Sequence, residues 1–182
     1  MNKRSFYVNN IVFIALCSAI TVVCSQISVP IGPVPVTLQT FAIALSGYLL
    51  GAKGGTAAVT VYIITGLIGL PVFAGFKGGI SVLFGPTGGF LIGFIVLAFF
   101  CGVGKKAKRT FLQLFSGAAG LLLCHALGTV IFSVLFSSQY SFWQAFLTVS
   151  APFLIKDAVS IGAAYLLSLL LVKIKQLSYK NN

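Results

Sequence analysis

Apolar residues along this chain form long runs, separated by short segments rich in glycine, proline or basic side chains. About 20 apolar residues in a helix cross a hydrocarbon layer about 30 Å thick, so runs of this kind predict membrane-spanning helices. We therefore expect an all-α integral membrane protein, in which residues 1–182 form a single transmembrane domain of six helices. The helices are expected at about residues 9–29, 37–50, 54–69, 85–103, 111–136 and 146–172.

The overall composition excludes a soluble domain of this size. Hydrophobic residues make up 58% of the chain and charged residues only 7%, whereas a soluble domain carries about 25% charged residues. The short polar segments also leave no room for a separate water-soluble domain.

The basic residues indicate how the helices are oriented. Ten of the twelve lie before the first predicted helix, after the last one, or in alternate loops, and these are Lys3, Arg4, Lys53, Lys105, Lys106, Lys108, Arg109, Lys173, Lys175 and Lys180. With six crossings all ten fall on one side, which the positive-inside rule identifies as cytoplasmic. Both termini are therefore expected in the cytoplasm. The net charge of +11 is interpreted as topology and lipid-headgroup contact, with no nucleic acid as a partner.

The nucleophilic and metal-ligating residues predict no catalytic centre. Cys17, Cys24, Cys101 and Cys124 lie in apolar runs without a CxxC spacing and are expected to be buried hydrophobes. His125 stands alone in its run, with no acid or cysteine pair nearby, and is expected to be a core residue. Walker A, HExxH and GxSxG motifs do not occur in the sequence, so we expect neither an enzyme nor a cofactor or metal.

Asp157 is the only acidic residue of the chain and lies in the sixth predicted helix, toward the outer side. A carboxylate in hydrocarbon is costly unless it is paired or hydrated, so it marks a functional site by default. The alternatives are a structural ion pair with Lys156 and hydration by the outer headgroup layer. Neighbouring residues on a helix point about 100° apart, which favours separate partners for Lys156 and Asp157, one of them a ligand.

Polar and glycine-rich loops gather on the same outer side. The first loop, residues 30–36, is stiffened by prolines and leads into Thr37, Gln39 and Thr40, for which a plain turn with a helix cap is the alternative. The other candidate residues are Phe73, Phe76 and Lys77 in one glycine-rich stretch and Gly85, Thr87 and Gly88 in the next. Irregular backbone at membrane depth is tolerated where protein or a wet cavity satisfies it, and tight helix packing is the alternative.

These features together predict a pocket that opens outward and takes a small molecule with an anionic end and hydrogen-bond donors. No charge relay crosses the membrane and no inverted repeat is evident. A binding subunit that takes its energy from a partner fits these observations. Ala15 and Ala19 in the first helix have a small-xxx-small spacing that permits close approach of another helix.

The central part of the chain resembles a known family. The segments VPVTLQTFAIALSGYLLG (34–51), GLIGLPVFAGFKGG (66–79) and FGPTGGFLIGF (84–94) are similar to the BioY family, the biotin-binding S components of energy-coupling-factor (ECF) vitamin transporters. The resemblance extends over about residues 9–172. It implies six helices, cytoplasmic termini, a bacterial cell membrane and biotin as the ligand. It also implies two kinds of partner, a transmembrane coupling subunit and a pair of cytoplasmic ABC ATPases, with Ala15 and Ala19 as the docking surface.

The resemblance also suggests roles for the candidate residues. Asp157 is expected to accept a ureido N–H of biotin, and Lys156, or alternatively Lys77, to pair with its carboxylate. Thr37, Gln39 and the backbone of residues 85–89, with Gly85, Thr87 and Gly88, would add polar contacts, and Phe73 and Phe76 an apolar wall. The chain departs from the family pattern at Ser160, where a lysine often follows the aspartate by three residues.

Three other functions remain as alternatives at this point. An S component for another vitamin would share the topology, and a stand-alone facilitator would need no ATPase. An intramembrane enzyme is disfavoured, because the chain has no second acid and no His/Ser/Cys constellation.

Overall fold

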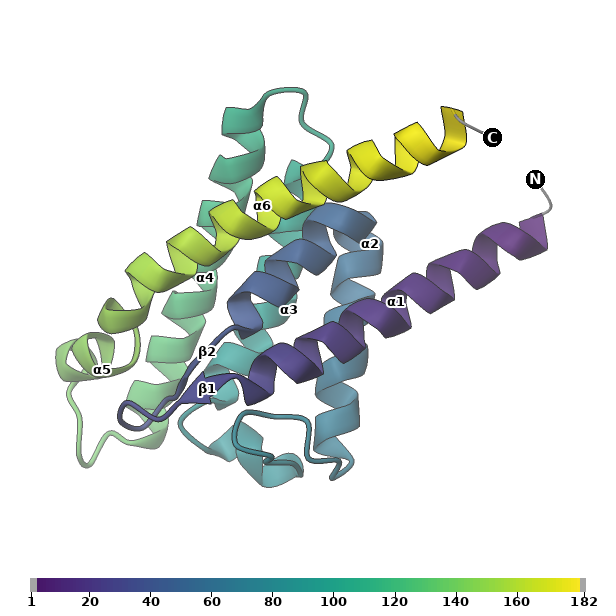
Figure 1. Cartoon of the computed structure of the whole chain (residues 1–182). Coiled ribbons are helices and arrows are strands. Elements are labelled where there is room, and N and C mark those ends of the chain that lie inside the picture. The colour runs from purple at the N-terminus through teal and green to yellow at the C-terminus, as the bar shows by residue number, and fades with distance from the viewer. Residues whose placement is uncertain (1–2, 181–182) are drawn as a thin grey trace.

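Helices make up almost all of the computed structural model, which describes residues 3–180 and the side chains of residues 10–174 (Figure 1). In chain order the elements are α1 (Lys3–Gln26), β1 (Ser28–Val29), β2 (Val36–Thr37), α2 (Gln39–Leu67), the 3-10 helix η1 (Ile80–Phe84), α3 (Gly88–Gly104), α4 (Thr110–Leu135), α5 (Phe142–Val149) and α6 (Ala151–Lys180). The two short strands pair antiparallel, with Ser28 opposite Thr37. The all-α class expected from the sequence is confirmed.

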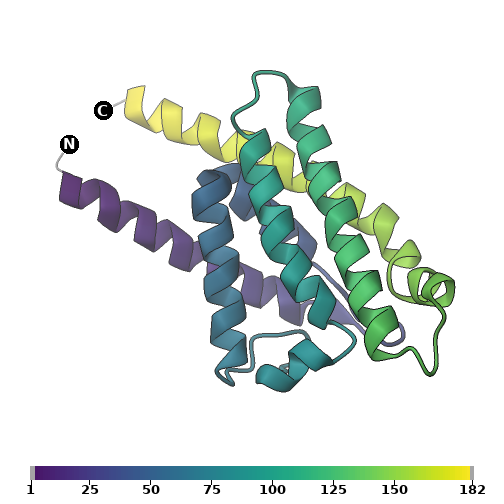
Figure 2. The same ribbon diagram turned by 180° about the vertical axis from the view of Figure 1, so that it is seen from behind.

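A sharp turn divides α2 into two arms. Gly51 has φ 75° and ψ 177°, a conformation that is essentially restricted to glycine, and the chain doubles back at this point (Figures 1 and 2). The Lys105 ammonium donates to the Leu49 carbonyl at 2.5 Å, which satisfies one acceptor left open where the first arm ends. The two arms correspond to the helices expected at residues 37–50 and 54–69.

Glycine residues bring α2, α3 and α4 into close contact. A Cβ atom on Gly47 would lie 2.5 Å from the Ala98 carbonyl oxygen of α3, and one on Gly93 would lie 2.8 Å from Cys124 Cα of α4. Both distances are shorter than van der Waals contact, so a larger residue would push these backbones apart. The three helices form the close-packed centre of the molecule, and both α1 and α6 pack against α2.

The last apolar run differs from its prediction. A continuous helix was expected over residues 146–172, but the helix breaks at Ser150, which has φ −125° and ψ −53°. A capping box between Ser141 and Gln144 begins α5 within the stretch expected to be a loop. Pro152 lies in the first turn of α6, where its missing N–H is tolerated. Hydropathy did not register this break because the residues on both sides are equally apolar.

Large apolar side chains cover much of the helix surface. Ile155 is 79% exposed, Val159 66% and Leu122 62%, and water would be a poor solvent for so much apolar area. Within the described residues, α4 and residues 151–174 of α6 are long and apolar enough to cross a membrane, while residues 10–26 and 88–104 form shorter apolar helices. This surface is typical of a membrane protein.

The two ends of the described chain lie on the same side of the molecule (Figures 1 and 2). The side chains of Lys3, Arg4, Lys175 and Lys180, which contributed to the predicted orientation, lie outside the described residues.

The two small residues of α1 lie on its uncovered face. Cys17 and Thr21 are buried on the side that packs against α2. Ala15 and Ala19 are both exposed, next to Leu16, which is 52% exposed. Ala15, Leu16 and Ala19 therefore form a narrow exposed apolar surface along α1.

The tight α2–α3 contact generates a first prediction. A Cβ on Gly102 would overlap the backbone of Gly51 and Ala52, which form the turn of α2 and have little freedom to move. We expect Gly102→Ala to lower the thermal midpoint of the purified protein by about 3–10 °C. Gly162→Ala is the matched control, because nothing lies within 4 Å of a Cβ there. An equal midpoint for the two variants, measured by circular dichroism in detergent, would contradict the packing argument.

Candidate functional site

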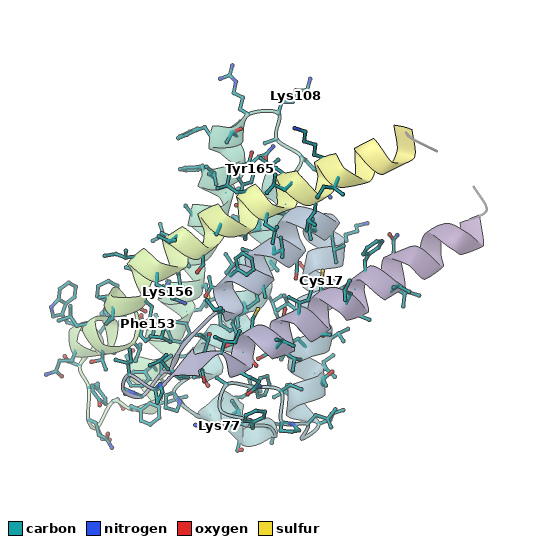
Figure 3. All side chains as sticks on the ribbon, viewed as in Figure 1. Cys17, Lys77, Lys108, Phe153, Lys156 and Tyr165 are labelled. Carbon is teal, nitrogen blue, oxygen red and sulfur yellow. The ribbon has the colours of Figure 1, made fainter. Side chains whose placement is uncertain are left out.

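A cavity lies where the β1–β2 hairpin, the loop at residues 73–77 and the ends of several helices meet. It has about 70 Å³ of free space, room for on the order of five water molecules. Seven of the predicted site residues line it, namely Thr37, Gln39, Phe73, Lys77, Thr87, Lys156 and Asp157. In Figure 3, Lys156, Phe153 and Lys77 lie toward one end of the molecule, and Lys108 lies at the opposite end.

Asp157 is the electrostatic centre of this cavity. It is only 6% exposed, and its carboxylate forms an ion pair through Oδ1 with the ammonium of Lys156. His125 Nε2 of α4 lies 3.2 Å from the other oxygen, Oδ2. His125 is buried, as expected of a core residue. The expectations of separate partners for Lys156 and Asp157, and of no acid near His125, were wrong. The side chain of Lys156 is long and flexible, so its ammonium can reach the carboxylate of the adjacent Asp157. The acid that contacts His125 is Asp157, which lies 32 positions further along the chain.

Lys156 also connects α6 to the hairpin. Its ammonium donates to the Thr37 carbonyl at 2.7 Å. The Thr37 hydroxyl in turn donates to Gln39 Oε1 at 3.1 Å, and Gln39 Nε2 donates to the Tyr62 hydroxyl at 2.5 Å. Buried polar groups are stable when every member has a partner. The hairpin is thus held over the cavity by a continuous chain of hydrogen bonds that ends at Asp157.

Phe73 forms part of the apolar wall. It is 3% exposed, and its ring packs edge-to-face on Tyr62 with centroids 5.5 Å apart. Gln26 Nε2 donates to the Phe73 carbonyl at 3.1 Å, which fixes the loop to α1. Phe76 behaves differently from the prediction. It has φ 57°, is 72% exposed and is not among the residues that line the cavity.

Gly85 and Gly88, which lie at the junction of η1 and α3, were also predicted to belong to the site. Gly85 and Gly88 do not line the cavity, whereas Thr87 between them does. A Cβ on Gly88 would overlap the backbone of Leu83, so this glycine allows η1 to approach the start of α3. For Gly88 the tight-packing alternative fits the structure better than ligand contact. At Gly85 the nearest atom to an added Cβ would be the Val82 carbonyl oxygen, at 3.3 Å.

Several lining residues were missed from the sequence. They are mainly apolar and come from segments far apart in the sequence, with Val34, Phe90, Phe94, Val149 and Phe153 as examples. Phe90 and Phe94 are four residues apart and so share one face of α3, a signal that was present in the sequence. The buried His125 was another such signal, because a polar side chain in an apolar run requires a partner.

The described residues offer no metal centre. Among residues 10–174, no group of three His, Cys, Asp or Glu side chains lies close enough to hold an ion. The chemistry that the cavity does support is non-covalent, with one carboxylate acceptor, two lysines and an aromatic wall. Such a site suits a small ligand that carries N–H donors, an apolar body and an anionic group.

Comparison with known proteins gives consistent results. The BioY family model matches residues 1–177. The biotin transporter BioY of Thermotoga maritima is 44% identical over 159 residues, or 87% of this chain and 92% of that protein. The probable biotin transporter BioY of Pyrococcus horikoshii is 39% identical over 85% of this chain and 91% of that protein.

The fold comparison agrees with the sequence matches. The crystal structure of an S-component for biotin from an ECF-type ABC transporter superposes with a TM-score of 0.81, covering 97% of this chain and 95% of that chain at 26% identity. The family model spans nearly all of this sequence, and the resemblance noted in its central segments is confirmed. The chain therefore belongs to the BioY family.

Proposed function

We propose that this chain is the high-affinity biotin-binding subunit, or S component, of an ECF-type ABC transporter for biotin uptake. The observation that carries the proposal is the buried Asp157 carboxylate in a cavity with aromatic walls. Biotin has two ureido N–H donors, an apolar thiophane ring and a valerate carboxylate. The relatives named as biotin transporters support the same ligand.

Asp157 receives the ureido N–H groups in this proposal, because hydrogen bonds to a charged acceptor are strong. Phe73, Phe90 and Phe94 enclose the thiophane ring. Lys77 pairs with the valerate carboxylate. It is exposed and lines the cavity, and it takes part in neither of the ion pairs found among residues 10–174. Lys156 is less suited to that role, because it already holds Asp157 and Thr37.

We propose that the hairpin moves when biotin enters. The cavity has about 70 Å³ of free space, too little for a molecule larger than on the order of five waters. The hydrogen bond between Lys156 and the Thr37 carbonyl spans the boundary between the hairpin and α6. We therefore place the opening of the site at this contact.

We propose six membrane crossings, formed by α1, the two arms of α2, α3, α4 and α6, within one domain. Both termini then lie in the cytoplasm of a bacterial cell, and α5 lies at the outer surface with the cavity. The subunit carries no ATPase motif, so energy comes from a coupling transmembrane subunit and two cytoplasmic ATPases. The exposed Ala15 and Ala19 provide the surface for the coupling subunit.

The role of Asp157 is tested by Asp157→Asn. We expect this variant to bind biotin at least about tenfold more weakly, because a neutral amide is a weaker acceptor than a carboxylate. Isothermal titration calorimetry on purified protein, with thiamine and riboflavin as comparison ligands, measures the effect. Lys108→Gln, at the opposite end of the molecule, is the control (Figure 3). Failure of the unaltered protein to bind biotin, or its binding of another vitamin instead, would refute the proposed function.

The carboxylate partner is tested by comparing biotin with its methyl ester. The unaltered protein is expected to prefer biotin, and Lys77→Gln to reduce that preference about fivefold, the upper range for a solvent-exposed ion pair. Lys108→Gln again serves as the control. A preference that survives in Lys77→Gln but disappears in Lys156→Gln would assign the carboxylate to Lys156.

The docking surface is tested by Ala15→Leu and Ala19→Leu. Larger side chains on this face would keep a partner helix at a distance, so co-purification of the coupling subunit and ATPases should be lost while biotin binding persists. Ala163→Leu introduces the same bulk on an exposed position of α6. Retention of the complex by both α1 variants would place the docking surface elsewhere.

A further inference from the structure

The only acidic residue and the only histidine of the chain contact each other. They come from different helices, α4 and α6, and both are more than nine-tenths buried, with 4% of His125 and 6% of Asp157 exposed. A contact between two unique ionisable groups in an apolar bundle calls for a physical explanation. Asp157 already has a counter-charge in Lys156, whereas a buried His125 without Asp157 would have an unsatisfied ring N–H.

The surroundings of His125 indicate its protonation state. Nε2 faces the Asp157 carboxylate, which only accepts, so Nε2 carries a proton. Nδ1 is buried and has no hydrogen-bond partner within the described part of the chain. A proton on Nδ1 would leave that N–H unsatisfied. It would also give the cluster a net positive charge, because Lys156 already neutralises Asp157. The neutral tautomer with hydrogen on Nε2 is the one that fits.

The imidazole ring has one further contact, and the backbone of His125 has another. Phe90 packs against it edge-to-face, with centroids 5.7 Å apart. The Ser150 hydroxyl lies 3.4 Å from the His125 carbonyl oxygen and 2.6 Å from the Thr129 hydroxyl. These contacts join α4 to the break between α5 and α6. The donor that reaches Asp157 is therefore fixed by the packing of three helices.

The ring also separates two environments. His125 lines the cavity and also borders an apolar groove formed with residues such as Leu122, Phe142 and Leu154. That groove offers no charged group to compete for the imidazole. The polar end of the ring is thus directed to Asp157.

We propose that His125 is a positioning residue for the substrate carboxylate acceptor. Its Nε2–H holds Asp157 Oδ2 while Lys156 holds Oδ1, so rotation of the carboxylate is restricted. A carboxylate has about four lone-pair sites. His125 and Lys156 occupy two of these sites, and the Thr40 hydroxyl also lies within hydrogen-bonding reach of the carboxylate. The capacity that remains is available to a ureido N–H donor. His125 acts through Asp157 and does not itself bind the ligand. This inference rests on the proposed function.

The first test needs no variant. Because the chain has one histidine, NMR of isotope-labelled histidine in the full-length protein reports on His125 alone. We expect the signature of a neutral ring with hydrogen on Nε2, and a clear change in the ring nitrogen shifts in Asp157→Asn. An imidazolium, or a neutral ring with hydrogen on Nδ1, would overturn the proposal even if biotin binds.

The second test is a double-mutant cycle on biotin affinity. His125→Phe keeps a ring but removes the donor, and we expect about 10- to 100-fold weaker binding in the otherwise unaltered protein. In the Asp157→Asn background the same change should have an effect of less than about threefold, since the interaction it removes is already lost. His125→Gln, whose amide can donate to Asp157, should recover most of the affinity that His125→Phe loses.

The outcomes are distinguishable. Equal losses in both backgrounds would mean that His125 acts independently of Asp157, and no loss in the unaltered background would mean that it has no role. Thermal midpoints identify variants that fail to fold. If the His125 variants fail to fold, the NMR measurement of the His125 tautomer in the unaltered protein tests the proposal. If that protein does not bind biotin at all, the proposed function fails, while the NMR spectrum still shows whether His125 and Asp157 form the inferred pair.

Discussion

A single carboxylate buried in an apolar bundle is the constraint on which the site depends. An isolated charge at this depth would be strongly unfavourable, so Asp157 must be paired or neutralised. Lys156 from the same helix provides the counter-charge, and His125 from α4 provides a donor. Lys156 also reaches the Thr37 carbonyl of the hairpin. Groups from α4, α6 and the β1–β2 hairpin thus meet around one acid.

The close packing of α2, α3 and α4 positions the segments that carry the site. Gly47 and Gly93 allow α2, α3 and α4 to approach more closely than larger residues would permit. The turn at Gly51 sends the second arm of α2 back toward the cavity, where Tyr62 meets Gln39 and Phe73. Small residues in the packed centre therefore determine where the polar and aromatic groups of the site lie.

The same pairing bears on transport by an S component. A site that holds its carboxylate and lysine together carries little net charge, which lowers the penalty of moving it within a membrane. The hairpin contacts the rest of the site through the hydrogen bond between Lys156 and the Thr37 carbonyl and through Val34, which packs into the core. Lys156 thus contacts both the hairpin and the acid.

The sequence by itself determined that the chain consists of apolar helices, because crossing hydrocarbon requires long uninterrupted runs. It also identified Asp157, since one acid in such a sequence is conspicuous. Only the tertiary structure decided which groups meet that acid. Hydropathy carries no information on side-chain direction or on contacts between distant segments. For that reason the pairing of His125 with Asp157, the exposure of Phe76 and the break at Ser150 were not foreseen.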